Sequence, residues 1–164
     1  DIIVVPILQP IFRYQMARNY RQGRYQLKSP EKYKGDPTNI IYRSSWELKF
    51  LIWCDTHPSV LKFSSEETII PYYSPVDGKM HRYFVDFNIT LRQQDGTIKT
   101  YLIEVKPFAQ TQPPKNSRNK RVLMESVATY QVNLAKWEAA KKYCVKMGWE
   151  FKIVTEEELG IKKR

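Results

Sequence analysis

The sequence predicts one α/β domain in which helices flank a mixed central β-sheet, with an N-terminal arm ahead of it. Three observations predict this: a capped helical segment comes first, several short strands follow it, and a long helix then precedes one last strand. That order is typical of a mixed sheet packed between helices. At 164 residues the chain suits a single domain with a substantial core. No apolar run reaches the roughly 20 residues that a membrane-spanning helix needs.

The first 38 residues are basic and rich in tyrosine, and we expect them to form the arm, with the domain spanning residues 39–164. The whole chain carries 27 Lys and Arg residues against 17 Asp and Glu, a net charge of +10. This excess favours a polyanionic partner, most often nucleic acid. No basic amphipathic helix or RNA-binding motif favours a membrane surface or RNA instead. The candidate DNA-binding residues are Arg18, Arg21, Arg24, Lys115, Arg118, Lys120, Arg121 and Lys136.

The first helix is predicted over residues 44–57. Ser44 and Glu47 have the spacing of a capping box, apolar residues follow, and Pro58 ends the pattern. Short strands are predicted in residues 60–63 and 68–73, and the sequence Ser-Pro-Val-Asp-Gly-Lys after them predicts a turn.

The second half of the domain begins with an exposed loop over residues 108–120, which is polar and contains two prolines. A long helix is predicted over residues 121–147, with Gly148 as its C-terminal stop. Its expected buried face comprises Val127, Tyr130, Leu134, Trp137 and Cys144. A strand over residues 149–155 and a short acidic helix are expected to follow. The two cysteines, Cys54 and Cys144, are predicted to be buried thiols.

Residues 82–107 between these parts predict a β-hairpin whose strands each contain an acid. Because side chains alternate between the two faces of a strand, the odd-numbered residues Val85, Phe87, Ile89 and Leu91 are expected to build the core. Asp86, Glu104 and Lys106 are even-numbered and are expected on the opposite face. The two acids lie across from each other only if the loop has an odd number of residues. We therefore predict a three-residue loop, Gln94–Gly96, with Gly96 in the left-handed conformation.

Two carboxylates that face each other across a strand pair repel, and removal from water increases the repulsion. A divalent cation removes this conflict, and oxygen ligands suit Mg²⁺ or Mn²⁺. Lys106 places an ammonium group beside the two acids, where it could orient water or stabilise charge on a phosphoryl group. The alternative is an exposed edge acid, Asp86, beside a solvated pair of Glu104 and Lys106. The apolar residues Phe84 and Leu102 on the same face favour the functional interpretation.

An acid followed on the next strand by Glu-x-Lys resembles the PD-(D/E)xK nuclease superfamily. Asp86 matches the first acid and Glu104–Lys106 match the second element, while Val85 stands where the proline is usual. The resemblance implies a restriction-endonuclease-like core. It also implies that a glutamate on the preceding helix, here Glu47, takes part in the site; the alternative is that Glu47 simply completes the capping box with Ser44, and both roles together are possible.

Over residues 37–155 the sequence is similar to TnsA-type endonucleases and, in particular, to the head-completion nucleases of T-even-like tailed phages. This resemblance implies a Mg²⁺- or Mn²⁺-dependent deoxyribonuclease that acts on double-stranded DNA during phage head completion. The implied catalytic residues are Glu47, Asp86, Glu104 and Lys106, and the implied metal ligands are Asp86, Glu104, Glu47 and the carbonyl of Val105. Portal or neck proteins would be partners, and the protein would act in the host cytoplasm or within the virion.

Two other functions remain open at this point. The chain could be a structural connector or DNA-binding protein that keeps a nuclease fold, or a transposase subunit that nicks transposon ends together with a partner. The intact set of Asp86, Glu104 and Lys106 argues against complete loss of the chemistry.

Overall fold

A computed structural model describes residues 22–161, so Arg18 and Arg21 lie outside the described part of the chain. Two α-helices are present there, α2 (Ser45–Thr56) and α3 (Lys120–Met147), together with two short 3₁₀ helices, η2 (Pro30–Lys32) and η3 (Phe108–Thr111). The strands are β1 (Gly23–Arg24), β2 (Ile41–Tyr42), β3 (Val60–Ser65), β4 (Ile69–Tyr73), β5 (Met80–Phe84), β6 (Phe87–Arg92), β7 (Ile98–Val105) and β8 (Glu150–Val154).

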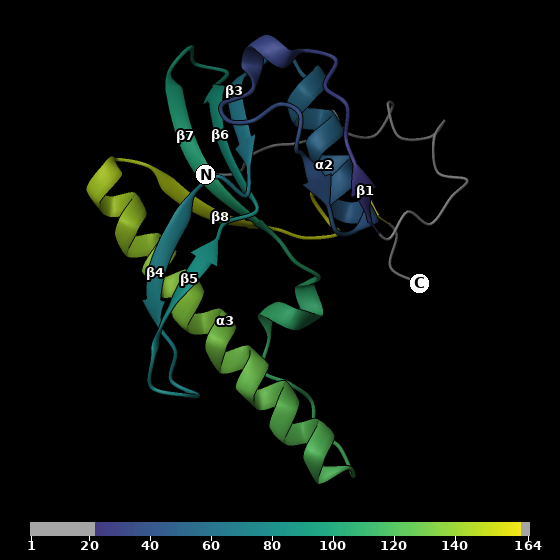
Figure 1. Ribbon diagram of the computed structural model, residues 1–164, viewed down its shortest axis with the longest axis vertical. Coiled ribbons are helices and arrows are strands. Elements are labelled where there is room, and N and C mark those ends of the chain that lie inside the picture. The colour runs from purple at the N-terminus through teal and green to yellow at the C-terminus, as the bar shows by residue number, and fades with distance from the viewer. Residues whose placement is uncertain (1–21, 162–164) are drawn as a thin grey trace.

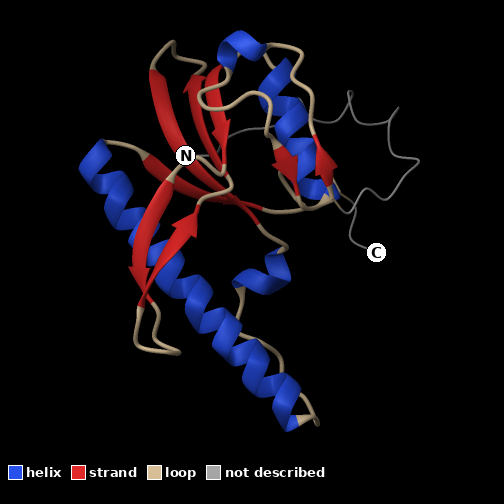
Figure 2. Cartoon of the chain, viewed as in Figure 1, coloured by secondary structure: helices blue, strands red, loops and turns tan. Residues whose placement is uncertain are grey.

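The central sheet has four strands in the order β3-β6-β7-β8. Strand β6 is antiparallel to both β3 and β7, whereas β8 lies parallel to β7. Helix α3 supplies the long connection that a parallel pair requires, because it carries the chain from the end of β7 back to the start of β8. The mixed sheet flanked by helices that the sequence predicts is confirmed (Figures 1 and 2).

The two helices bury opposite faces of the sheet. On one face α2 packs Phe50, Leu51 and Cys54 against the odd-numbered side chains of β6 and β7. On the other face the C-terminal half of α3 packs Trp137 and Cys144 against Leu102 and the β4–β5 ribbon. Both predicted buried thiols are therefore confirmed as buried and free.

The predicted register of the β6–β7 hairpin is confirmed. Phe87 pairs with Ile103 and Arg92 pairs with Ile98, while the N–H of Gln93 donates to the carbonyl of Thr97 at 2.7 Å. The loop is therefore Gln94–Gly96, and Gly96 has φ = 84°, in the left-handed region. Continued by one residue pair, this register sets Asp86 opposite Glu104.

The expectation of one continuous strand through Asp86 is wrong, because the chain breaks there into β5 and β6. Three residues separate Ser65 from Ile69 on one side of the break, whereas two separate Phe84 from Phe87 on the other. This is the arrangement of a β-bulge, which bends a strand pair and increases its twist. As a result β4 and β5 leave the sheet as a separate two-stranded ribbon (Figure 1).

The break also changes which side of the molecule each side chain faces. Val85 does not share a core with Phe87, as its odd number predicted, but packs with Tyr83 and Leu102 on the α3 side. Alternation along a strand holds only while the strand is continuous, so the parity argument stops at Asp86.

Two further expectations about the second half are corrected. Val127 and Leu134 were expected on the buried face of the long helix, but both are exposed. Asn133 is the first buried residue of α3, because the N-terminal half of this helix projects beyond the sheet (Figure 2). Residues 156–160 form a turn rather than a short acidic helix.

The described part of the predicted arm packs against α2 and the edge of the sheet. The carboxylate of Asp55, which is buried, accepts hydrogen bonds from the hydroxyl of Tyr25 and the N–H groups of Lys28 and Ser29, at 2.7, 2.8 and 2.8 Å. Three donors compensate the removal of this carboxylate from water. The boundary at residue 38 stays a prediction.

We predict that Gly96→Ala lowers the free energy of unfolding by about 1 kcal/mol, because an L-residue with a Cβ is strained at positive φ. A Cβ at this position would meet no other atom within 4 Å, so the cost would come from the backbone alone. Gly96→Asn serves as the matched control, since asparagine tolerates the left-handed conformation better. Urea denaturation measures both variants, and equal stability of Gly96→Ala and the unsubstituted protein would contradict the prediction.

Candidate active site

The break between β5 and β6 turns Asp86 toward the end of β7. Its Oδ2 atom accepts a hydrogen bond from the N–H of Val105 at 2.8 Å. The N–H and carbonyl of one strand residue point to the same neighbouring strand, and the next N–H, of Lys106, donates to Val154 on the other side. The carbonyl of Val105 therefore points to the side on which Asp86 lies.

Glu104 is held from two sides. Only 6% of the residue is exposed, and its Oε2 atom accepts a short hydrogen bond from the hydroxyl of Tyr83 on β5. Its Oε1 atom lies 3.2 Å from Nζ of Lys106. The side chain of Lys106 is 23% exposed, so its ammonium group reaches the surface beside the two carboxylates.

Asp86 has less compensation than Glu104. Removal from water raises the pKa of Asp86 well above its ordinary range, and the negative charge of Glu104 raises this pKa further. The hydrogen bond from Val105 and the charge of Lys106 oppose this rise, but they do not cancel it. The net effect is a raised pKa of Asp86, and its main cause is burial. Burial, followed by the neighbouring Glu104, also raises the pKa of Tyr83, which remains a neutral donor.

Glu47 lies in the first turn of α2, where Ser44 caps the helix as predicted. The Ser44 hydroxyl accepts from the N–H of Glu47 at 3.1 Å, and the Glu47 carboxylate accepts from the N–H of Arg43 at 2.9 Å. Burial raises the pKa of Glu47, and its charge contributes to raising the pKa of Asp86. Glu47 thus serves as a capping residue whose charge also acts on Asp86.

The donor set fits a hard divalent cation. Two carboxylates that repel each other and a main-chain carbonyl on the same side are oxygen ligands, which Mg²⁺ and Mn²⁺ prefer. Among residues 22–161 no three His, Cys, Asp or Glu side chains come together closely enough to hold a metal ion. In proteins Mg²⁺ is usually bound by one or two carboxylates, and water and phosphate complete its coordination. Glu47 as a direct ligand stays a proposal.

The predicted DNA-binding cations lie in separate places. Arg24 is exposed on β1, whereas Lys115, Arg118, Lys120 and Arg121 are exposed in the loop after η3 and at the projecting end of α3. Lys136 lies over the rings of Tyr72 and Tyr83, with Nζ at 5.8 and 5.6 Å from the ring centres. Lys136 is therefore connected to the candidate site through Tyr83, whose hydroxyl donates to Glu104.

Sequence reasoning missed three residues around the acids: Tyr83, Arg43 and Glu66. The sequence could have indicated Tyr83, because a tyrosine buried at an odd position of an apolar strand needs a partner for its hydroxyl. Arg43 and Glu66 form an ion pair between the entrance of α2 and the end of β3, with Nε and Oε1 2.8 Å apart. They lie 23 residues apart in the chain, and no local pattern connects them.

Comparison with known proteins identifies the family to which this chain belongs. Residues 57–156 match the family described as TnsA-like endonuclease N terminal. The chain belongs to this family. The matched segment contains Asp86, Glu104 and Lys106, so the predicted resemblance is confirmed over the hairpin that carries it. It begins after Glu47, which lies outside the matched residues.

A second similarity extends over more of the chain. The head completion nuclease of Enterobacteria phage T4 is 37% identical over 142 residues, which cover 84% of this chain and 92% of that protein. The similarity therefore covers most of both proteins. Among the described residues, neither α-helix is long and apolar enough to cross a membrane.

We predict that Tyr83→Phe destabilises the protein by about 1–3 kcal/mol, because it leaves a buried carboxylate oxygen of Glu104 without its donor. Tyr72→Phe is the matched control: Tyr72 lies on the same ribbon and is buried, but its hydroxyl forms no hydrogen bond with any residue in the described part of the chain. Its effect should stay within about 0.5 kcal/mol. Chemical denaturation of both variants tests this, and equal losses would show that Glu104 does not depend on Tyr83.

The raised pKa of Asp86 predicts how stability depends on pH in chelator. Between the ordinary carboxyl range and the raised pKa, the folded protein binds more protons than the unfolded chain, so stability falls as pH rises through that window. Asp86→Asn keeps an acceptor for Val105 but removes the charge, and should make this slope shallower; the raised pKa of Glu47 contributes the remainder. At neutral pH the variant should be more stable by on the order of 1 kcal/mol. Thermal melts from pH 4 to about pH 8 measure the difference, and parallel curves would refute it.

Proposed function

We propose that this protein is a metal-dependent DNA endonuclease that hydrolyses phosphodiester bonds during phage head completion. The observation that carries the proposal is the pair of carboxylates, Asp86 and Glu104, brought together at the end of β7 with Lys106 3.2 Å from Glu104. Membership of the TnsA-like endonuclease family supports the reaction type.

We assign each residue a role that its surroundings support. Asp86, Glu104 and the carbonyl of Val105 would hold Mg²⁺ or Mn²⁺, with Glu47 as a further candidate. A bound ion would supply Lewis-acid stabilisation of the negative charge that develops on the phosphoryl group. Lys106 reaches the surface beside the pair and is placed to orient a water molecule or to donate to a phosphate oxygen. Tyr83 keeps Glu104 in one orientation.

The substrate would be double-stranded DNA bound mainly through its phosphates. The net charge of +10 and the exposed cations at the N-terminal end of α3 support binding that does not read sequence. Arg24 and Lys136, together with Arg18 and Arg21 outside the described residues, complete the proposed DNA-binding set. Such binding should weaken steeply as salt concentration rises.

The biological setting rests on the phage T4 relative, whose name describes a nuclease of head completion. By this similarity the present protein would process packaged DNA ends before tail attachment. It would then meet portal or neck proteins, either in the host cytoplasm or within the assembled virion.

We expect plasmid DNA to be nicked or cut in Mg²⁺ or Mn²⁺ and to stay intact in chelator, as judged by gel electrophoresis. Asp86→Ala and Lys106→Ala should each reduce cleavage by at least about 100-fold, because each removes a group that acts at the reacting phosphate. Lys99→Ala is the control, since Lys99 pairs with Glu150 at the opposite end of β7 and β8. Full activity of Asp86→Ala would remove the proposed site.

A further inference from the structure

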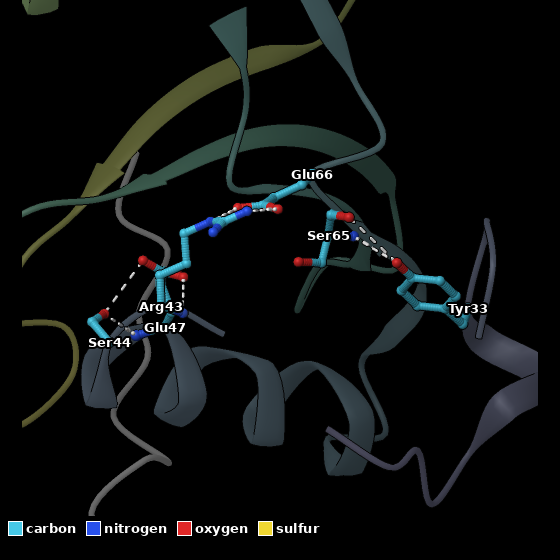
Figure 3. Close-up of polar contacts among 6 residues, drawn as sticks. All are labelled: Tyr33, Arg43, Ser44, Glu47, Ser65 and Glu66. Atoms are coloured by element: carbon cyan, nitrogen blue, oxygen red, sulfur yellow. Dashed lines mark hydrogen bonds and ion pairs between the residues drawn. The ribbon is translucent and has the colours of Figure 1, made fainter. Parts of the chain in front are cut away.

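Arg43 and Glu66 form a two-pronged ion pair next to the candidate active site. Nε of Arg43 donates to Oε1 of Glu66 at 2.8 Å, and Nη2 donates to Oε2 at 3.2 Å. Figure 3 shows the guanidinium group extended toward Glu66, with the carboxylate of Glu47 close to the backbone of Arg43. Such a fork fixes the plane of the guanidinium group as well as its position.

Both members of the pair are also tied to the candidate catalytic acids through their backbones. The N–H of Arg43 donates to the carboxylate of Glu47 at 2.9 Å. The N–H of Glu66 donates to the carbonyl of Asp86 at 3.1 Å. The ion pair therefore connects α2, the end of β3 and the break that carries Asp86.

The backbone of Glu66 has a conformation that few residues adopt. Its φ angle is +56°, and it is the only residue other than glycine with a positive φ in the described part of the chain. A non-glycine residue in this region is strained, and such strain persists where the surrounding structure enforces it. Here the bulge opposite Asp86 enforces it and aims the side chain of Glu66 at Arg43.

The guanidinium group keeps donors that can reach a ligand. The pair with Glu66 uses two of the five N–H bonds that a guanidinium group has. The Arg43 side chain is 56% exposed, against 28% for Glu66. Glu66 raises the pKa of Arg43 above its ordinary value, so the guanidinium group keeps its positive charge.

Stability alone does not account for this arrangement. An exposed ion pair contributes only about 0–1 kcal/mol, whereas the left-handed backbone of Glu66 costs on the order of 1 kcal/mol or more. The Lys99–Glu150 pair shows the ordinary case, because it joins two strand ends with no link to the acids.

We propose that Arg43 binds the phosphate group on which Asp86 and Glu104 act, and that Glu66 positions Arg43 for this contact. The inference rests on the proposed nuclease function. The fixed guanidinium group would donate its remaining N–H bonds to a phosphate oxygen and stabilise negative charge there as the bond to the leaving oxygen breaks. Glu66 does not touch the substrate.

The first experiment compares Arg43→Ala and Arg43→Lys with Lys99→Ala, which removes the same charge at the other end of the sheet. In Mg²⁺, Arg43→Ala should lower the cleavage rate at saturating DNA by about 100-fold, and Arg43→Lys should fall between it and the unsubstituted protein, because lysine lacks the planar fork. In chelator, without turnover, the slope of log Kd against log salt should decrease by about one for Arg43→Ala. Lys99→Ala should change neither quantity.

The second experiment separates positioning from simple ion pairing. The double variant Arg43→Glu/Glu66→Arg restores two opposite charges but removes the guanidinium group from position 43. If Arg43 binds the phosphate, the double variant should be more thermally stable than Arg43→Glu but should still not cleave DNA. Glu66→Gln keeps one acceptor, so it should lower the cleavage rate at saturating DNA by less than Arg43→Ala does and leave the salt slope unchanged.

The outcomes distinguish this inference from the proposed function. Recovery of cleavage by the charge swap, or activity of Arg43→Ala equal to that of Lys99→Ala, would overturn the role of Arg43 while Asp86→Ala still abolished cleavage. Absence of cleavage by the unsubstituted protein in every metal would instead count against the nuclease function itself. Thermal melts check that each variant is folded. If Arg43→Ala does not fold, the cleavage rate and salt slope of Arg43→Lys decide the question.

Discussion

The bulge opposite Asp86 is the constraint on which the site depends. One extra residue among 66–68, facing Val85 and Asp86, ends the sheet on one side and begins the β4–β5 ribbon on the other. The bend brings Tyr83, from the ribbon, to Glu104, from the sheet. It also turns Asp86 from a face position to the N–H of Val105. A continuous hairpin would keep Tyr83 and Phe87 on one face, and the hydroxyl that holds Glu104 would then lie on the wrong side of the sheet.

The two acids of the site differ in how well their surroundings compensate their negative charge. Glu104 has a hydroxyl donor and an ammonium group, whereas Asp86 has one N–H and two acids nearby. Repulsion within this group opposes folding of the metal-free chain, and a divalent cation would relieve it. Metal binding and folding would then be linked at these residues, and active sites are commonly less stable than the rest of a domain.

The sequence predicted what depends on local pattern. Residue parity and the Gln94–Gly96 loop placed Asp86 opposite Glu104, and the capping spacing placed the start of α2. It could not predict the break, because the bulge is formed by residues 66–68, about twenty residues before Asp86, and nothing in the run Tyr83–Phe87 marks it. The exposed Val127 and Leu134 were misassigned for a related reason: helical periodicity identifies a face, but not how much of the helix the sheet covers. The pairing of Arg43 with Glu66 likewise depends on tertiary structure.

The N-terminal half of α3 projects beyond the sheet (Figure 2). Thirteen residues, Lys120–Val132, precede the first buried residue of the helix, and at about 1.5 Å per residue they extend roughly 20 Å. A duplex rises about 3.4 Å per base pair along each strand, so that length corresponds to about six base pairs. The cations at the tip of the helix would then contact the backbone well away from the bond being cut.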